Sequence, residues 1–233
     1  MGGVRYSVVV PAHDELENLG RLVDELVRVL EGDYEVILVD DNSSDGTSEL
    51  CDRLCELDSR VKSVHRRGGG GGMGYALMEG SEIAVGEYVV WVMGDRSDRL
   101  ETVKDILGKL DEGYDVVLAS RYMPGGSRGN LGLGKALCGS AYTFLARLVF
   151  GLHVHDITNA FRGFRRSVLR EAGVKSGDFT ISPEFAIKAH LRGFRLGEVP
   201  TRYSDRRAGR TKFRMLSAGV GYLSLLRLRF GGW

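Results

Sequence analysis

Two adjacent carboxylates, Asp40 and Asp41, follow a short apolar run and begin a polar turn. The run is 36–39, and the turn passes through Asp45 and Gly46 into a helical stretch. In an open parallel sheet, ligands bind outside the carboxyl ends of the strands, so carboxylates there can accept hydrogen bonds from base and ribose groups. The same residues would also form an ordinary Asx-type turn with a helix N-cap, and the pair alone leaves both readings open.

The cations of the chain are concentrated in its second half. Up to Ala119 there are 12 Lys and Arg against 25 Asp and Glu, whereas from Ser120 onward there are 20 against 6, so the halves carry −13 and +14. A basic half of this kind suits nucleic acid, a membrane surface or a phosphorylated substrate. Nucleic acid is the weakest of the three, because the chain has no RNA-recognition, KH or zinc-finger signature.

The elements that must position these charges alternate along the chain. Apolar runs predict strands at 6–11, 36–39, 61–65, 88–93 and 116–119, and helical spacing predicts helices near 16–30, 73–84 and 100–110. Each of the first four strands ends in a polar or glycine-rich turn. Alternation of this kind predicts an α/β fold with a mostly parallel sheet covered by helices on both faces.

Several motifs follow one another in a fixed order along almost the whole chain. Val-Val-Pro-Ala-His-Asp-Glu-Leu-Glu-Asn-Leu at 9–19, Val-Asp-Asp-Asn-Ser-Ser-Asp-Gly-Thr at 39–47 and the turn at Asp95 resemble the Rossmann-like GT-A fold of family 2 glycosyltransferases. Motifs in the second half of the chain narrow the resemblance to one group within this family. The segments 120–122, 125–127, 158–164, 183–189, 198–200 and 205–212 are similar to the dolichol-phosphate mannose synthase group, which glycosylates polyprenyl phosphates.

The resemblance implies a nucleotide-sugar site at the strand ends. The residues that it assigns to the donor are Pro11, Glu15, Asp40, Asp41, Gly74, Asp95, Asp156 and Glu184. Asp156 and Glu184 would lie near the sugar. For Glu15, a first-turn carboxylate that complements the helix dipole is the alternative, and Glu184 could equally be a helix-face carboxylate without a ligand.

A divalent metal, Mg²⁺ or Mn²⁺, is also implied. Members of the family usually carry a DxD triplet at the strand end, whereas this chain has Met-Gly-Asp-Arg-Ser-Asp at 93–98, so the first acid is missing. We place Asp95 on the last Asp of the triplet, with Ser97 and Asp98 as further candidate ligands. Waters and the diphosphate would complete the coordination shell.

The acceptor would be held by cations of the second half. The expected acceptor-phosphate residues are Arg121, Arg128, Lys135 and Arg207, and the residues expected to act in catalysis are Asp95, Arg121, Arg206 and Lys212. The implied reaction is inverting transfer of a sugar from a nucleotide sugar to a polyprenyl or dolichyl phosphate. GDP-mannose is the leading donor, and UDP-glucose or UDP-N-acetylglucosamine is the alternative.

Two other functions remain open at this point. Gly-Gly-Gly-Gly-Met-Gly at 69–74 satisfies the GxGxxG pattern of a dinucleotide-dependent oxidoreductase, although two strand–helix units precede it and such a fingerprint normally lies in the first. The altered DxD turn favours a non-catalytic subunit that binds a nucleotide sugar or a lipid phosphate. Three cysteines fit no zinc or disulfide framework, which is typical of a reduced, cytoplasmic protein.

We expect one GT-A domain over 1–213, followed by a C-terminal amphipathic helix over 214–233. Apolar residues of the helix are interleaved with Arg214, Arg227 and Arg229, and the stretch is shorter than the roughly 20 apolar residues of a spanning helix. It would either pack on the domain or lie at the headgroup level of a membrane. We expect a peripheral protein on the cytoplasmic face of a membrane, to which a partner subunit could supply a membrane anchor. No secretory signal begins the chain.

Overall fold

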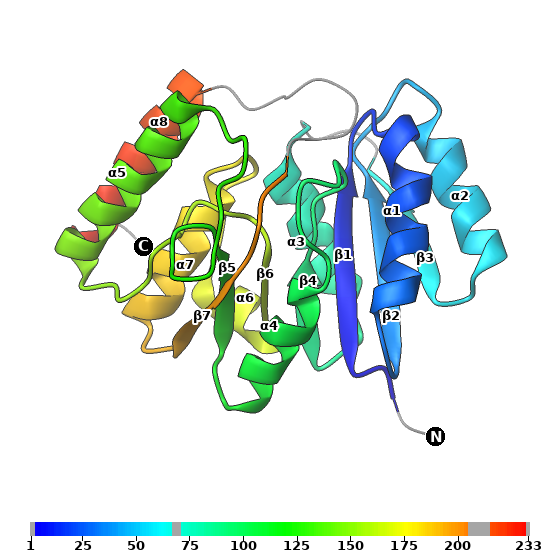
Figure 1. The fold of residues 1–233 in the computed structure, drawn as a ribbon, viewed down its shortest axis with the longest axis horizontal. Coiled ribbons are helices and arrows are strands. Elements are labelled where there is room, and N and C mark those ends of the chain that lie inside the picture. The colour runs from blue at the N-terminus through cyan, green and yellow to red at the C-terminus, as the bar shows by residue number, and fades with distance from the viewer. Residues whose placement is uncertain (1–2, 67–70, 205–214, 232–233) are drawn as a thin grey trace.

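The computed structural model of the 233-residue chain describes residues 3–66, 71–204 and 215–231. It contains a central sheet covered by helices on both faces (Figure 1). The strands are β1 (Tyr6–Ala12), β2 (Tyr34–Asp40), β3 (Val61–His65), β4 (Tyr88–Trp91), β5 (Val116–Ser120), β6 (Arg162–Arg165) and β7 (Leu196–Pro200). The helices are α1 (Leu16–Val29), α2 (Thr47–Leu57), α3 (Met73–Ile83), α4 (Thr102–Asp111), α5 (Leu133–Phe150), α6 (Arg166–Ala172), α7 (Ile181–Leu191) and α8 (Met215–Ser224), and the 3₁₀ helix η1 (Leu225–Phe230) follows α8.

The sheet order is β3-β2-β1-β4-β6-β5-β7. β1 pairs in parallel with β2 from Tyr6–Tyr34 to Ala12–Asp40, and the pairs β1–β4, β2–β3 and β5–β7 are parallel as well. Among the seven strands of the described residues, only β6 runs antiparallel to its neighbours, β4 and β5. The expected α/β fold with a mostly parallel sheet is therefore confirmed.

The strands are apolar because both faces of the sheet are covered. All seven residues of β2 are buried, and on β1 the side chains of Val8 and Val10 enter one core while Val9 enters the other. Helices α1, α2 and α4 pack on the first face, and α3, α5, α6, α7 and α8 pack on the second. These layers hold the strand ends rigidly at one edge.

Strands β6 and β7 were not expected from the sequence. β6 reads Arg-Gly-Phe-Arg and has too few apolar residues to stand out, yet it lies between β4 and β5. Gly163 is needed there because a Cβ would lie 2.3 Å from the side chain of Ile106 on α4. The inserted antiparallel strand brings Arg162 and the segment before it to the middle of the sheet.

The C-terminal helix packs on the domain. α8 lies beside α5 at one end of the molecule (Figure 1), and the rings of Tyr142 and Tyr222 contact each other at a tilt of 31° with their centroids 4.8 Å apart. Tyr222, Leu225 and Leu228 are buried. The sequence left open whether this helix packs on the domain or lies at the headgroup level of a membrane. Its buried side chains are explained by packing on the domain. No helix among residues 3–66, 71–204 and 215–231 is long and apolar enough to cross a bilayer.

Candidate active site

A cavity of about 850 Å³ opens at the edge where β1, β2, β4 and β5 end. Sheet ends of this kind are where α/β proteins bind their ligands. The residues singled out in the sequence that line it are Pro11, Glu15, Asp41, Asp95, Ser97, Arg121 and Lys135. The cavity continues from the strand ends toward α5, α7 and α8, which also contribute lining residues.

Three strand-end turns around the cavity hold non-glycine residues in a left-handed backbone conformation. These residues are Asp14 after β1, Asn42 after β2 and Arg96 after β4, with φ of 53°, 61° and 58°. The first two turns are interlocked, since the backbone N–H of Asp14 donates to Ser43 Oγ at 3.0 Å and that of Ser44 donates to Asp14 Oδ1 at 2.9 Å. Backbone strain of this kind clusters at functional sites, where surrounding contacts maintain it.

Asp41 faces the cavity, and its carboxylate is already paired. Arg66, at the end of β3, forms an ion pair with it, and the backbone N–H of Gly72 also donates to it. Arg66 is itself held by Glu79, with Nε 2.9 Å from the carboxylate. Gly71 and Gly72 thus lie near the end of β2 and line the cavity together with Asp41.

The sequence predicts that Asp40 lies in the nucleotide-sugar site, but the structure places it elsewhere. It does not line the cavity. One of its oxygens accepts from Ser48 Oγ at 2.6 Å and lies 3.4 Å from His65 Nδ1, while the other accepts from the N–H of Ser43 at 3.2 Å. Burial raises the pKa of Asp40, but these hydrogen bonds outweigh it and hold the pKa below its usual value. Asp40 therefore fixes the turn that presents Asp41.

Gly74 and Glu184 also lie behind the cavity wall. A Cβ on Gly74 would lie 2.3 Å from the carbonyl oxygen of Ser176, so glycine lets α3 approach that loop closely. Glu184 accepts from the N–H of Ser176 at 2.7 Å and pairs with Lys188 at 2.7 Å, with both side chains buried. Burial raises the pKa of Glu184, but these contacts outweigh it and lower the pKa. Its oxygens hold the loop against α3.

The turn after β4 contributes one carboxylate to the cavity wall. Asp95 lines the cavity and accepts from the N–H of Ser97 at 3.1 Å, whereas Asp98 is not among the lining residues. Burial and then the nearby charge of Asp95 raise the pKa of Asp98 to about 7. Among the described side chains, no group of three or more His, Cys, Asp or Glu residues could hold a metal ion.

Arg121 is the best-defined cation of the cavity. Its Nε and Nη2 lie 2.7 and 3.0 Å from the two carboxylate oxygens of Asp156, and Nη2 also donates to Thr158 Oγ1 at 3.0 Å. Burial lowers the pKa of Arg121, but the charge of Asp156 outweighs it, so the pKa lies above its usual value. Asp156 has no exposed surface and lies behind Arg121, where it orients the guanidinium.

The other expected cations are only partly brought together. Lys135, in the first turn of α5, lines the cavity, while Arg128 is exposed and does not. Arg206, Arg207 and Lys212 lie outside the described residues.

Sequence reasoning missed the part of the wall that comes from α5, α7, α8 and the loop before α7. Its members are Cys138, Tyr142, Leu145, Phe179, Ser182, Tyr222 and Leu223. The signal was present in α5, where Lys135, Cys138, Tyr142 and Leu145 recur at helical spacing and so share one face.

The geometry agrees with the comparisons with known proteins. Residues 7–173 match the model of the family described as glycosyl transferase family 2. The chain is 30% identical over 215 residues to the polyprenol monophosphomannose synthase of Mycolicibacterium smegmatis, covering 89% of this chain and 80% of that protein. It is also 30% identical over 210 residues to glycosyltransferase AglD of Haloferax volcanii, covering 85% of this chain but 33% of that protein.

Solved structures share the fold. Glucosyl-3-phosphoglycerate synthase of Mycobacterium tuberculosis, with Mn²⁺, UDP-glucose and phosphoglyceric acid, has a TM-score of 0.75 at 19% identity over 98% of this chain and 80% of that chain. TarS of S. aureus with UDP-GlcNAc has a TM-score of 0.71 at 19% identity over 98% of this chain and 67% of that chain. The dinucleotide-binding alternative has no support in these matches. The chain belongs to glycosyltransferase family 2.

Proposed function

We propose that this glycosyltransferase moves a sugar from a nucleotide sugar to a polyprenyl or dolichyl phosphate at a membrane surface. The leading donor is GDP-mannose, which would transfer mannose, and the alternatives are UDP-glucose and UDP-N-acetylglucosamine. The name of the Mycolicibacterium relative, a polyprenol monophosphomannose synthase, supports both the lipid acceptor and mannose. The UDP-sugar complexes of the structural neighbours keep the uridine donors open.

The observation that carries the proposal is the two-ended cavity. Its wall at the strand ends carries Asp41 and Asp95, and its wall on α5 and α8 carries the apolar side chains of Leu145 and Leu223. A polyprenyl phosphate has the matching shape, because a charged head is joined to a long apolar chain. Arg121 and Lys135 also line this cavity, where cations can bind the phosphate of the acceptor and the diphosphate of the donor.

The chemistry follows from placing two anions in one cavity. A phosphate oxygen of the acceptor attacks the anomeric carbon, the bond from that carbon to the nucleoside diphosphate breaks, and the configuration inverts. Arg121, oriented by Asp156, offsets the repulsion between the two anions and positions the nucleophile. A phosphate monoester is largely dianionic at neutral pH, so no residue needs to remove a proton from it.

Asp95 is the residue that would hold a divalent metal, Mg²⁺ or Mn²⁺. It is the acidic side chain of the altered DxD turn that reaches the cavity, with Ser97 beside it. One carboxylate fits a cation whose remaining ligands are diphosphate oxygens and water, which is how Mg²⁺ is usually bound at such sites. When bound, the cation neutralises negative charge on the departing diphosphate.

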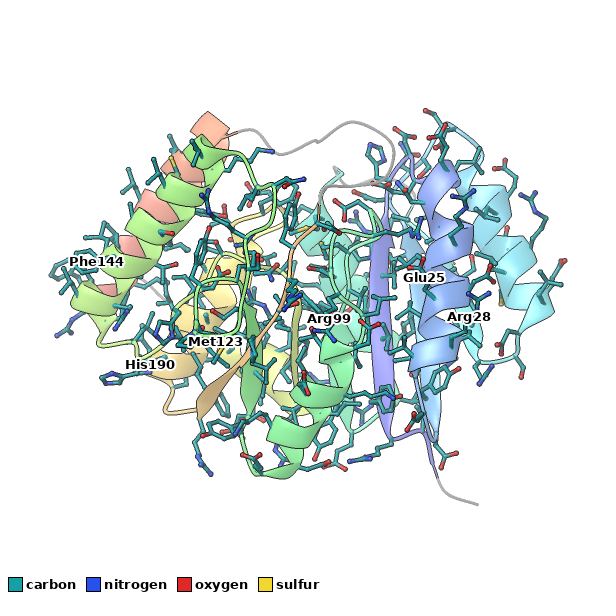
Figure 2. The ribbon with its side chains drawn as sticks, in the orientation of Figure 1. Glu25, Arg28, Arg99, Met123, Phe144 and His190 are labelled. Atoms are coloured by element: carbon teal, nitrogen blue, oxygen red, sulfur yellow. The ribbon has the colours of Figure 1, made fainter. Side chains whose placement is uncertain are left out.

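The outer surface of α5 supports contact with a membrane. Leu137, Phe144 and Leu148 are 69%, 62% and 69% exposed, and Phe144 projects away from the body of the protein (Figure 2). Their spacing of seven and four residues puts them on one helix face. On the neighbouring helix α8, Val220 and Leu223 are 71% and 58% exposed. An interfacial position of this face would bring the apolar end of the cavity to the lipid.

A location on the cytoplasmic face and a separate membrane-anchor subunit remain predictions.

The test of function is transfer of radiolabelled sugar to a short-chain polyprenyl phosphate. The purified chain is offered GDP-mannose, UDP-glucose and UDP-N-acetylglucosamine in turn, with Mg²⁺ or Mn²⁺, and the label extracted into organic solvent is counted. We expect one donor to give a lipid-soluble, acid-labile product with inverted anomeric configuration.

A non-catalytic binding subunit is the second candidate. The observation in its favour is that the turn after β4 offers the cavity one carboxylate, Asp95. Nucleotide-sugar binding without transfer to any acceptor, in the presence of either metal, would select this alternative. Failure to bind any nucleotide would reject the transferase and a nucleotide-sugar subunit alike, and would leave a subunit that binds a lipid phosphate.

A further inference from the structure

Glu198 is a carboxylate on β7 that takes no part in the transfer step proposed above. It begins the segment 198–200, one of the motifs of the second half of the chain, and its register partner is Leu118 on β5. Its side chain is only 7% exposed, and it does not line the cavity. Carboxylates are rarely buried unless they are paired, so the contacts of Glu198 must explain its position.

The oxygens of Glu198 bind a single loop, the one that joins α5 to β6. Oε1 accepts from two successive backbone N–H groups, those of His155 at 2.7 Å and Asp156 at 3.0 Å. Oε2 lies 2.8 Å from Nδ1 of the His155 side chain. Hydrogen bonds to an ionised carboxylate are stronger than those between neutral groups. Glu198 therefore anchors this loop to the edge of the sheet.

The anchored loop carries the carboxylate that orients Arg121. Besides the two contacts of the guanidinium with Asp156, the backbone N–H of Arg121 donates to Asp156 Oδ2 at 3.3 Å. Thr158 Oγ1, on the same loop, accepts a further bond from Nη2. The side-chain hydrogen bonds of Arg121 to described residues thus use Nε and Nη2, which leaves Nη1 for an anion in the cavity.

The loop is held on both sides of Asp156. On the far side, the Asn159 side chain donates from Nδ2 to the carbonyl oxygen of Ala119 on β5 at 2.9 Å. On the near side, Glu198 holds the N–H of Asp156 itself. Without Glu198 the loop would stay attached through Asn159, but Asp156 could shift and turn the guanidinium with it. A displacement of about 1 Å is enough to slow a reaction that depends on positioning.

We infer that Glu198 is a positioning residue for sugar transfer, which acts through Asp156 to fix the direction in which Arg121 presents Nη1. The inference rests on the proposed function, in which Arg121 positions the phosphate nucleophile. It extends the group of residues that control the reaction to β7, a strand that does not line the cavity.

The experiment compares Glu198→Gln and Glu198→Ala in single-turnover sugar transfer. Gln has the same shape and its carbonyl oxygen can still accept from the two N–H groups, but without the charge, so we expect kcat to fall roughly 3- to 10-fold. Ala removes the anchor, and the expected loss is roughly 10- to 100-fold. The loss should lie in kcat more than in the KM for the donor, because the task of Arg121 is to position the nucleophile.

A double-mutant cycle identifies the residue through which Glu198 acts. In the Asp156→Asn background, Glu198→Gln should lower kcat no further, since the carboxylate that it positions is already absent. The cycle uses Gln, so it gives a result even where Glu198→Ala does not fold.

Glu35→Gln is the matched control. Glu35 is also a buried carboxylate on a strand, and it accepts from the backbone N–H of Val85 at 2.8 Å, but it lies near the start of β2, away from the cavity. This variant should lose thermal stability while kcat of the folded protein stays at the wild-type value.

Each outcome has a separate meaning. Wild-type kcat in both Glu198 variants would overturn the inference and leave the proposed function standing. A loss that is as large in the Asp156→Asn background as in the wild type, or an equal loss in Glu35→Gln, would also overturn it, because Glu198 would then not act through Asp156. Absence of transfer by the wild-type protein from any of the three donors would overturn the proposed function and this inference together.

Discussion

Arg121 and Asp156 form a two-point ion pair, with Nε 2.7 Å and Nη2 3.0 Å from the two carboxylate oxygens. The carboxylate is completely buried, while the guanidinium lines the cavity. Asp156 belongs to the segment before the antiparallel strand β6, so the insertion of β6 between β4 and β5 is what brings it behind Arg121. The pair fixes the direction from which an anion can approach the cation.

Replacing Asp156 should therefore affect stability and activity together. Asp156→Asn leaves the Arg121 charge buried beside a neutral amide, and we expect a loss of about 3 kcal/mol in the free energy of unfolding. Sugar transfer should fall by at least about tenfold because the cation is no longer oriented. Urea denaturation and single-turnover transfer provide the two measurements.

The control breaks an exposed ion pair. Lys109 and Glu112 are 2.6 Å apart with side chains 35% and 57% exposed, and Glu112→Gln should cost less than about 1 kcal/mol. Equal losses in the two variants would mean that burial of the Arg121–Asp156 pair has no special effect.

We expect sugar transfer and nucleotide affinity to depend on a divalent metal through Asp95. We expect Asp95→Ala to abolish transfer and the metal-dependent part of nucleotide affinity, while the melting temperature stays close to that of the wild type. Asp98→Ala should reduce metal-dependent affinity less, because Asp98 does not line the cavity. Calorimetric titration of the nucleotide with and without Mn²⁺ measures the difference, and an Asp95 variant with unchanged Mn²⁺ dependence would refute the assignment.

Asp98 should make stability depend on pH. Its pKa in the folded protein is about 7, raised first by burial and then by Asp95, whereas an unfolded Asp titrates near about 4. Between these values the folded state keeps a proton that the unfolded state has released, so stability should decrease as pH rises through this window and level off above it.

In Asp98→Asn the side chain no longer titrates, so the free energy of unfolding should lose the part of its pH dependence that comes from Asp98. The free energy of unfolding is measured in urea from about pH 5 to about pH 8 without divalent cations, so that only protons compete for the carboxyl. Parallel curves for wild type and variant would show that another group controls the pH dependence.

Four of the first five strands could be predicted from the sequence because each contains an uninterrupted apolar run with a turn after it, whereas β3, Val-Lys-Ser-Val-His, stands out only by its place before the glycine-rich stretch. β6 could not, since Arg162 and Arg165 occupy half of its four positions and its place depends on pairing with two strands far away in the chain. α5 was hidden by Gly132, Gly134 and Gly139 near its start. Local pattern therefore located the parallel core of the sheet but not the elements that close the far side of the cavity.

Site prediction had a similar limit. Asp40 and Asp41 are indistinguishable in sequence, and only the fold decides that Ser48 and His65 bond to the first while the second faces the cavity. Glu184 was correctly placed on a helix, yet its oxygens are taken by the loop at Ser176. Which polar atoms are already paired depends on residues from other elements, and no local motif encodes it.

The exposed face of α5 should bind membranes. In a triple variant, Leu137→Ser, Phe144→Ser and Leu148→Ser, sedimentation with anionic liposomes should decrease, while melting temperature and nucleotide affinity stay unchanged. Leu57→Ser is the matched control, because Leu57 is 82% exposed on α2, at the opposite end of the molecule (Figure 1). Equal sedimentation of the triple variant and the control would contradict the membrane role.

Deleting residues 215–233 would be a poor test of the same idea. Tyr222, Leu225 and Leu228 are buried, and Tyr222 forms part of the cavity wall, so the truncation would damage the core as well as any membrane contact. Substitutions on the outer surface of α5 avoid this ambiguity.

The reaction should need no dedicated general base. A sugar hydroxyl must lose a proton when it attacks, whereas a phosphate monoester has a second pKa near about 6 and is already dianionic at neutral pH. Asp156 and Glu184 are both buried and bonded, the first to Arg121 and the second to Lys188 and Ser176, which leaves neither in position to accept a proton from a substrate. The acidic limb of the pH profile should then belong to the acceptor.

The measurement is kcat/KM against pH for wild type, Asp156→Asn and Glu184→Gln. Both variants should react more slowly, because Arg121 loses its orientation in one and the loop at Ser176 loses its anchor in the other. The apparent pKa of the acidic limb should nevertheless stay the same in all three proteins, and it should shift when a phosphonate with a higher second pKa replaces the phosphate acceptor. Loss of the limb in either variant would identify that carboxylate as the base and point to a hydroxyl acceptor instead of a lipid phosphate.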